Sequence, residues 1–206
     1  MLDKLNIVQQ RFNEISDLII QPDIITDQKR YIKLNKEYKE FGIIVEKKKL
    51  YEDNDERAIF FAKGVVETIK KLNWTPDIIH VHGWIASLMP LYLKQYYKDE
   101  PLFSKSKVVT SIYENEITGD LNSGIINKIK FDEVESDTLN VLENPTYENL
   151  YKLSIMNSDG VVFASENIKK SFLDVAMNSK ITVLKCGFKE GFEKEYMDFY
   201  NDKILN

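Results

Sequence analysis

The sequence has 206 residues, of which 43% are hydrophobic and 12% aromatic, so it can bury the core of one domain with an appendage, and disorder throughout the chain is excluded. Its formal net charge of −5 argues against a broad phosphate-binding surface, and we expect no nucleic-acid partner. The chain has a single cysteine, Cys186, so an internal disulfide is excluded. No apolar run approaches the ~18 residues that a membrane helix needs, and we therefore expect a cytoplasmic protein with no membrane partner.

The first 50 residues show the pattern of a helical hairpin. Apolar side chains recur every three or four positions over residues 2–20, which predicts a helix of about five turns. Gln21-Pro22 ends it, because proline disfavours helical geometry in the residue before it. Thr26-Asp27 then caps a second helix over 27–48. Such a hairpin either binds a protein partner or a second copy, or covers the core of the rest of the chain.

From Asn54 onward the pattern changes to that of an α/β domain, so we expect two domains, residues 1–50 and 54–206. A helix over 54–72 is followed by four short apolar runs that are typical of buried strands, at 77–81, 107–112, 160–164 and 181–184. Helical patterns follow these runs at 84–97, 146–157, 166–177 and 192–204. Strands that alternate with helices predict a mainly parallel, Rossmann-like sheet. The polar stretch 114–145 is expected to be a long irregular loop, either functional or mobile.

The two histidines of the chain, His80 and His82, lie in the first of these strands. Residues i and i+2 of a strand point to one face, so the pair could chelate a metal, but the motif has no acidic or cysteine partner, and we expect neither a metal nor a cofactor. His80 is expected to be a buried histidine with satisfied hydrogen bonds. His82 falls at the carboxyl end of a parallel strand, where ligand crevices form, and is either a ligand contact or structural. Trp84 either caps the core or stacks on a sugar.

Three other features are weaker candidates. Ser165-Glu166 follows a strand and opens a predicted helix, so Ser165 is an N-cap or its neighbouring backbone amides hold an anion. Cys186 has no histidine beside it in the sequence, which argues against a nucleophile. Five aromatic residues with helical spacing are expected to form the packing face of the last helix: Phe188, Phe192, Tyr196, Phe199 and Tyr200.

Residues 54–206 resemble the N-terminal domain of bacterial glycogen (starch) synthases, and most closely the short, single-domain glycogen synthase-like proteins. The resemblance rests on "NDERAIFFAKGVVETIKKLNWTPDIIHVHGWIASLMPLYLK", "KVVTSIYENEITG" and "LYKLSIMNSDGVVFASENI". It implies a GT-B glycosyltransferase (a hexosyltransferase) with two facing Rossmann-like domains, which transfers glucose from a nucleotide-sugar to an α-1,4-glucan. The partners that it implies are ADP-glucose or UDP-glucose and a glucan.

Residues 1–50 resemble instead the opening helices of a class I bacterial peptide chain release factor, through "MLDKLNIVQQRFNEISDLIIQPDIITDQKRYIKLNKEYKE". The Gly-Gly-Gln motif with which that family releases peptides does not occur in this sequence. The chain therefore reads as a fusion of two unrelated segments. This supports an alternative interpretation, a non-enzymatic scaffold whose hairpin binds a partner, ribosome-related by resemblance.

The glycogen synthase resemblance also indicates which parts of the chemistry to expect. The family's glycine-rich lysine loop would precede residue 54 and its second Rossmann domain would follow residue 206, and this sequence contains neither. The family's His-x-His-Asp-Trp-His reads His80-Val81-His82-Gly83-Trp84-Ile85 here, and Tyr113 stands where the next strand usually carries a histidine. We assign no catalytic residue and expect the isolated chain to be inactive. Any ligand is expected to face five residues: His82, Gly83, Trp84, Tyr113 and Glu114.

Overall fold

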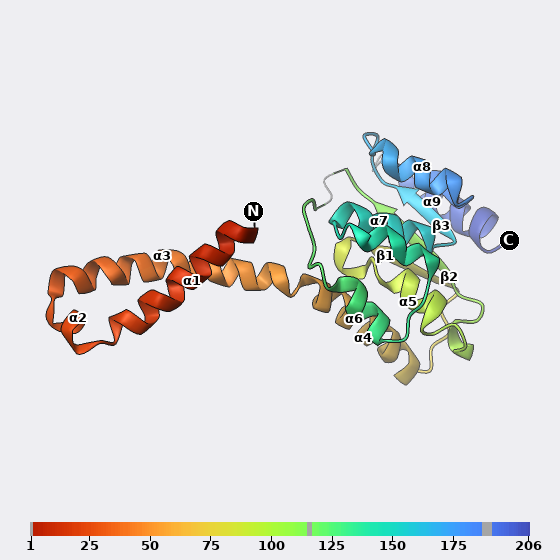
Figure 1. Cartoon of the computed structure of the whole chain (residues 1–206). Helices are drawn as coiled ribbons and strands as arrows, with labels where there is room; N and C mark the ends of the chain where they lie inside the picture. The colour runs from red at the N-terminus through yellow and green to blue at the C-terminus, as the bar shows by residue number, and fades with distance from the viewer. Residues whose placement is uncertain (1, 115–116, 187–190) are drawn as a thin grey trace. The chain divides into compact units, whose positions relative to one another are not determined.

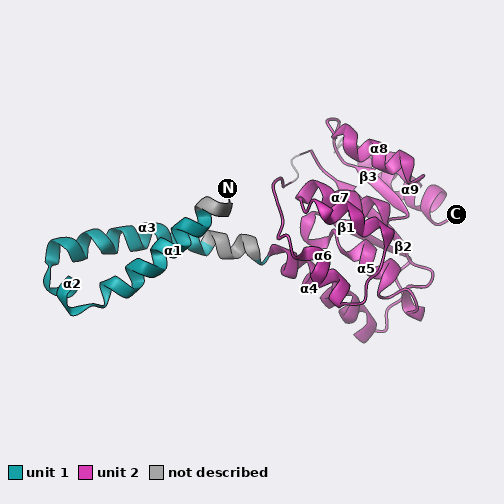
Figure 2. Cartoon of the chain, in the orientation of Figure 1, with its two compact units in different colours: residues 1–53 teal, residues 54–206 magenta. Residues whose placement is uncertain are grey.

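The computed structural model describes residues 2–114, 117–186 and 191–206. The chain divides into two compact units, unit 1 at residues 1–53 and unit 2 at residues 54–206 (Figures 1 and 2). The sheet belongs to unit 2, whereas unit 1 is helical in its described part.

Unit 1 is a helical hairpin of α1 (Leu2–Ile19) and α3 (Gln28–Glu52), with the short α2 (Pro22–Thr26) between them. Proline suits the first position of α2, where its missing N–H would have had no helical partner. Three aliphatic side chains are buried in the core of the hairpin: Ile15, Ile24 and Leu34. The rings of Phe12 and Tyr38 stack with centroids 4.5 Å apart and join α1 to α3. The predicted hairpin is confirmed, and α2 is an addition to it.

Unit 2 contains a parallel sheet with the strand order β1-β2-β3-β4. Its strands are β1 (Ile78–His82), β2 (Lys107–Ile112), β3 (Gly160–Phe163) and β4 (Thr182–Lys185), each within one residue of its predicted bounds. Branched aliphatic residues dominate them because a parallel sheet is covered on both faces. The predicted α/β class and parallel sheet are confirmed.

The two faces of the sheet are covered by different parts of the chain. On one face, α7 (Tyr147–Met156) lies against β2, where the hydroxyl of Thr110 is 2.9 Å from Ser154 Oγ and 2.8 Å from Ser158 Oγ. Two further helices contact α7, namely α5 (Met89–Gln95) and α8 (Lys170–Asn178), and α4 (Asn54–Lys71) contacts α5.

The opposite face packs against the C-terminal segment, which consists of α9 (Phe192–Phe199) and the π-helical turn η4 (Tyr200–Ile204). Phe199 and Ile204 are buried there against Val109 and Val162 of the sheet. Aromatic residues of this segment do form its packing face, as predicted, through Phe192, Tyr196, Phe199 and Tyr200. Phe188, the fifth member of the predicted set, lies outside the described residues.

Three helical assignments differ from the sequence expectation. The stretch 114–145 was expected to be irregular but contains α6 (Ile125–Phe131) and the 3-10 helix η3 (Asp137–Glu143), each too short to show a helical period clearly. The helix expected over 84–97 divides into the 3-10 turn η1 (Trp84–Ala86) and α5, which restarts where Pro90 can occupy a first-turn position. The helix expected from residue 166 begins at Lys170.

A 3-10 turn, η2 (Pro101–Phe103), connects α5 to β2. In the part of the chain that the structure describes, no helix combines the length and the apolar character that crossing a bilayer requires.

Candidate functional site

Polar side chains gather at the carboxyl ends of β1, β2 and β3. The register pairs His82 of β1 with Ser111 of β2, and it pairs Ile112 of β2 with Phe163 of β3. Because carboxyl ends of parallel strands meet at one edge of a sheet, residues from three separate parts of the sequence come together there.

His80 lies on β1 two residues before this edge, and both of its ring nitrogens have hydrogen-bond partners. Nδ1 is 2.5 Å from the hydroxyl of Tyr200, and Nε2 is 2.8 Å from Oγ of Ser111. Burial of the ring, with the neighbouring His82 as a smaller contribution, lowers the pKa of His80 to about 4. At neutral pH one nitrogen therefore donates and the other accepts a hydrogen bond, so His80 acts as a structural cross-link between β1, β2 and η4.

His82 ends β1 and is exposed, unlike His80. Its Nδ1 atom is 2.7 Å from the hydroxyl of Tyr113, the first residue after β2, and its ring lies 4.2 Å from that of His80, centroid to centroid. Partial burial of the ring lowers the pKa of His82, so the neutral imidazole is the form at pH 7. Because Nδ1 bonds Tyr113, Nε2 is the ring atom with which His82 could meet a ligand.

Gly83 turns the chain sharply after β1. Its φ of +73° and ψ of 170° belong to a region that only glycine occupies without strain, and a Cβ atom there would meet no atom within 4 Å. The backbone conformation, rather than crowding, thus requires glycine at this position. Trp84 follows at the start of η1 and packs edge-on against Tyr147, with ring centroids 5.7 Å apart.

Glu114 ties the end of β2 to the segment after β3. Its carboxylate accepts hydrogen bonds from Ser165 Oγ at 3.0 Å and from Asn167 Nδ2 at 3.2 Å. Ser165 Oγ in turn accepts a hydrogen bond from the backbone N–H of Asn167 at 3.3 Å. The expectation that Ser165 caps a helix is wrong, because α8 begins at Lys170 and its N-cap is Lys169.

The structure therefore brings together His82 with Tyr113 and, along the same edge, Glu114 with Ser165 and Asn167. We call the polar side chains of His82, Tyr113, Glu114, Ser165 and Asn167 the strand-end row. Neutral imidazole, phenol, amide and carboxylate groups in a row offer both donors and acceptors, which is what a sugar or ribose hydroxyl needs. The sequence did not point to Asn167 or to the Tyr200 partner of His80, because nothing local signals either contact.

Comparison with known proteins gives two kinds of match. The sequence profile of the starch synthase catalytic domain family matches residues 16–182. A glycogen synthase of Elusimicrobium minutum is 39% identical over 166 residues, which cover 75% of this chain and 34% of that protein. A glycogen synthase of Chlorobium limicola is 32% identical over 161 residues, covering 74% of this chain and 32% of that protein.

The second kind of match is shorter and closer. Peptide chain release factor 1 of Flavobacterium johnsoniae is 65% identical over 51 residues, which cover 25% of this chain and 14% of that protein. The chain thus combines a release-factor-like segment with a glycogen-synthase-like one, as a fusion would. It spans about a third or less of the length of the relatives named here.

Proposed function

This chain belongs to the starch synthase catalytic domain family, and on that premise we propose that its strand-end row is the edge at which a nucleotide-sugar and a glucan bind. The observation that carries the proposal is the hydrogen bond between His82 and Tyr113, 2.7 Å long, at the ends of two adjacent parallel strands. Open α/β sheets bind ligands at this kind of edge. ADP-glucose and UDP-glucose are the candidate donors, and Gly83 and Trp84 complete the ligand-facing set with Glu114.

Within this proposal the residues divide into two roles. His82 Nε2 and the Tyr113 hydroxyl hydrogen-bond the ligand, whereas His80 holds β1 against η4 through Tyr200 and contributes no proton at neutral pH. Glu114 is held by Ser165 and Asn167, so its carboxylate is oriented before a ligand arrives. Gly83 allows the backbone to turn away directly after His82, which keeps the strand end accessible.

We further propose that the 206-residue chain by itself does not transfer glucose at a measurable rate. Transfer needs preorganised groups that neutralise the charge of the departing nucleoside diphosphate, and loss of one such donor costs on the order of 10²–10³ in rate. Ile85 occupies the position where the resembled motif has a sugar-facing histidine, and its side chain has no hydrogen-bonding atom. The relatives named glycogen synthase are more than twice as long as this chain, since 161 and 166 aligned residues make up only 32% and 34% of them.

Binding is tested by fluorescence titration. The chain has two tryptophans, Trp74 and Trp84, so a Trp74→Phe background leaves Trp84 as the reporter beside the site. ADP-glucose, UDP-glucose and maltooligosaccharides are titrated into this protein, and we expect one nucleotide-sugar to bind with an affinity that His82→Ala weakens at least about 10-fold, equivalent to ~1.4 kcal/mol. Tyr96→Phe, which removes a hydroxyl elsewhere in unit 2, serves as the control. Equal affinities in His82→Ala and the control would refute the site.

Catalysis is tested separately with labelled ADP-glucose or UDP-glucose and glycogen. We expect incorporation no greater than that of a boiled sample. Incorporation well above that level, abolished by His82→Ala, would show that the chain is a working enzyme and that the inactivity proposed here is wrong.

A second candidate function rests on unit 1. Its helices bury a core of their own, and they leave Ile7, Ile20 and Ile32 exposed at 65%, 73% and 62%. With a release-factor-like sequence of this kind, unit 1 could act as a partner-binding module carried on a non-enzymatic scaffold, with a ribosome-related partner by resemblance. Co-sedimentation with purified ribosomes tests it, with Ile20→Asp and Ile32→Asp as the variants, and no co-sedimentation of the wild type would refute it.

A further inference from the structure

One face of α4 is turned to solvent and carries a regular series of residues. The series is Arg57, Phe60, Gly64, Glu67 and Lys71. Successive members are four or three positions apart, which is the spacing of a single stripe along a helix. The buried stripe on the other side of α4 consists of Ala58, Ala62, Val66 and Ile69. The exposed stripe is therefore not needed for the core of unit 2.

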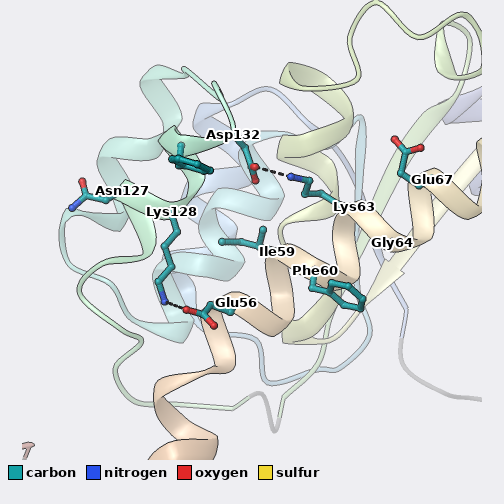
Figure 3. Close-up of a pocket in the computed structure, with 10 residues that line it drawn as sticks. Glu56, Ile59, Phe60, Lys63, Gly64, Glu67, Asn127, Lys128 and Asp132 are labelled. Atoms are coloured by element: carbon teal, nitrogen blue, oxygen red, sulfur yellow. Dashed lines mark hydrogen bonds and ion pairs between the residues drawn. The ribbon is translucent and has the colours of Figure 1, made fainter.

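The centre of this stripe combines a projecting ring with a hollow. Phe60 is 79% exposed, and a Cβ atom at Gly64 would meet no atom within 4 Å. Figure 3 shows Phe60 extending outward from α4 with Gly64 one turn further along the helix. Both residues line a groove of about 740 Å³ between α4 and α6, and Phe131 of α6, 88% exposed, borders it. Two exposed aromatic rings thus gather at one groove, and clustered apolar surface of this kind marks interaction sites.

The charged residues in the groove are held by contacts within unit 2. Lys63 Nζ lies 2.6 Å from Asp132 Oδ1, and Lys128 Nζ lies 2.7 Å from Glu56 Oε1 (Figure 3). These pairs fix the walls of the groove. The charged residues of the exposed stripe flank its centre, with Arg57 before Phe60 and with Glu67 and Lys71 after Gly64, and all three are exposed. Glu67 also forms an exposed ion pair with Lys70, with Nζ and Oε1 3.3 Å apart.

The exposed stripe is complementary to the same stripe of a second copy when the two α4 helices pack antiparallel. When the helix of a second copy runs antiparallel and is centred on residue 62, Phe60 of each copy faces Gly64 of the other. Arg57 then faces Glu67, so these pairs join either a ring to a hollow or opposite charges. We infer that two copies of this chain form a two-fold symmetric dimer through α4, in which the Phe60 ring of each copy fills the groove over Gly64 of the other.

The geometry of packed helices permits this arrangement. A glycine at the crossing lets two helices approach to about 8 Å, the short end of the usual range. At a rise of 1.5 Å per residue, the two Arg57–Glu67 pairs stand about 7.5 Å on either side of the two-fold axis, within reach of their long side chains when the helices cross at a shallow angle. Symmetry makes each contact occur twice, so one substitution changes the interface at two places.

Charge reversal gives the sharpest test. Arg57→Glu and Glu67→Arg each place like charges opposite each other twice in the dimer, whereas the double variant restores opposite charges in reversed order. Sedimentation equilibrium at low ionic strength should show a concentration-dependent dimer of the full chain. We expect each single variant to raise its dissociation constant at least about 10-fold and the double variant to return it to within about threefold of the wild type. A monomeric wild type, or a double variant no better than the singles, would overturn the inference.

Two further variants separate loss of the interface from loss of the fold. Gly64→Leu fills the hollow, and because glycine is unfavourable inside a helix, we expect a higher melting temperature together with loss of the dimer. Phe60→Ser removes the ring from a position outside the core and should also yield a monomer. The matched control is Met177→Ser in α8, a residue 74% exposed, which should leave the dissociation constant unchanged. A dimer that persists in both Gly64→Leu and Phe60→Ser forms through another surface, and the inference is then wrong.

Discussion

The hydroxyl of Tyr200 lies 2.5 Å from Nδ1 of His80, so the C-terminal segment is bound directly to the first strand of the sheet. Tyr200 belongs to η4 and His80 to β1, and the side chain of Ser111 holds the other ring nitrogen of His80 at 2.8 Å. Burial raises the pKa of Tyr200 to about 12, so its hydroxyl keeps its proton throughout the neutral range. The contact therefore depends on the charge of His80 alone.

The stability of unit 2 should fall as the pH is lowered from 7.5 to 5. The pKa of His80 is about 4 in the folded protein and about 6.5 in an unfolded chain, so between these values the unfolded state binds one proton more. Stability from this group is complete above pH 6.5 and is lost as the pH falls toward 4. For the partly exposed ring we expect a loss of roughly 1–2 kcal/mol at pH 5, measured by urea denaturation followed through tryptophan fluorescence.

His80→Gln supplies the control for that measurement. Glutamine keeps hydrogen-bonding atoms near Ser111 but does not titrate, so the variant should be less stable at pH 7.5 and show a shallower pH dependence. His82 also has a lowered pKa and remains in both proteins, so the difference between them isolates His80. Parallel pH curves for the two proteins would contradict the assignment.

Gly160→Ala should loosen the packing of the C-terminal segment on the sheet. A methyl group at Gly160 would overlap the terminal carbon of Ile204 and lie 3.0 Å from Cζ of Phe199, and both side chains are buried. Overpacking of this kind typically costs about 1–3 kcal/mol. Ile204→Val removes the overlapping carbon, so the double variant should recover most of the loss in thermal unfolding. A double variant as unstable as the single one would place the cause elsewhere.

Gly83→Ala should destabilise unit 2 although the added methyl group meets no neighbour. The cost arises because the φ of +73° with ψ of 170° is strained for any residue with a Cβ atom, by roughly 1–3 kcal/mol. Gly64→Ala makes the same chemical change at an open helical position and should be stabilising by about 0.5–1 kcal/mol. Chemical denaturation of both variants compares them directly, and equal effects would contradict the role given to the backbone of Gly83.

Lys128→Met should destabilise unit 2 by about 2 kcal/mol, because it leaves the buried carboxylate of Asp55 without its cation. Asp55 is 1% exposed, and its Oδ2 atom lies 2.8 Å from Lys128 Nζ as an ion pair. Although burial lowers the pKa of Lys128, hydrogen bonds to Asp55 and Glu56 raise it overall, so Lys128 stays charged at neutral pH. Lys130→Met, on the same helix, is the control. An equal loss of stability in both variants, measured in urea, would contradict this role.

The two units should unfold independently. Both tryptophans, Trp74 and Trp84, lie in unit 2, so fluorescence reports unit 2 alone while circular dichroism at 222 nm reports both units. Leu34→Ala, in the core of unit 1, should lower the midpoint of part of the dichroism signal and leave the fluorescence transition unchanged. Limited proteolysis should cut between residues 41 and 56. A single transition that shifts as a whole in Leu34→Ala would show one cooperative domain.

Hydrophobic periodicity was sufficient to predict the strands of the sheet. Runs such as Ile78–His82 and Lys107–Ile112 are short, branched and bounded by polar residues, which leaves few alternatives for a buried strand. It failed for α6, where only Ile125 and Ile129 are buried, since two side chains do not establish a helical period.

The candidate site shows the same division between local and long-range information. The position of His82 at a strand end follows from its place in the sequence, and its exposure there agrees with that position. The hydrogen bond between His80 and Tyr200 and that from Asn167 to Glu114 join residues 120 and 53 positions apart in the sequence. No local pattern encodes a contact over such a separation. They depend on how the helices return to the sheet, which is a property of the packing.

The face of the sheet that carries His80 also has a consequence for the time course of folding. Its cover comes from residues 192–204, more than a hundred positions after β1. When the chain is synthesised from its N-terminus, β1 and β2 can pair while that face is still open to water, and its apolar residues Ile78 and Val109 have no cover from α9 or η4. Contacts of such long range form slowly because the intervening chain must first be ordered. We therefore expect the nascent protein to pass through a stage at which the histidine face is exposed to chaperones and to other chains.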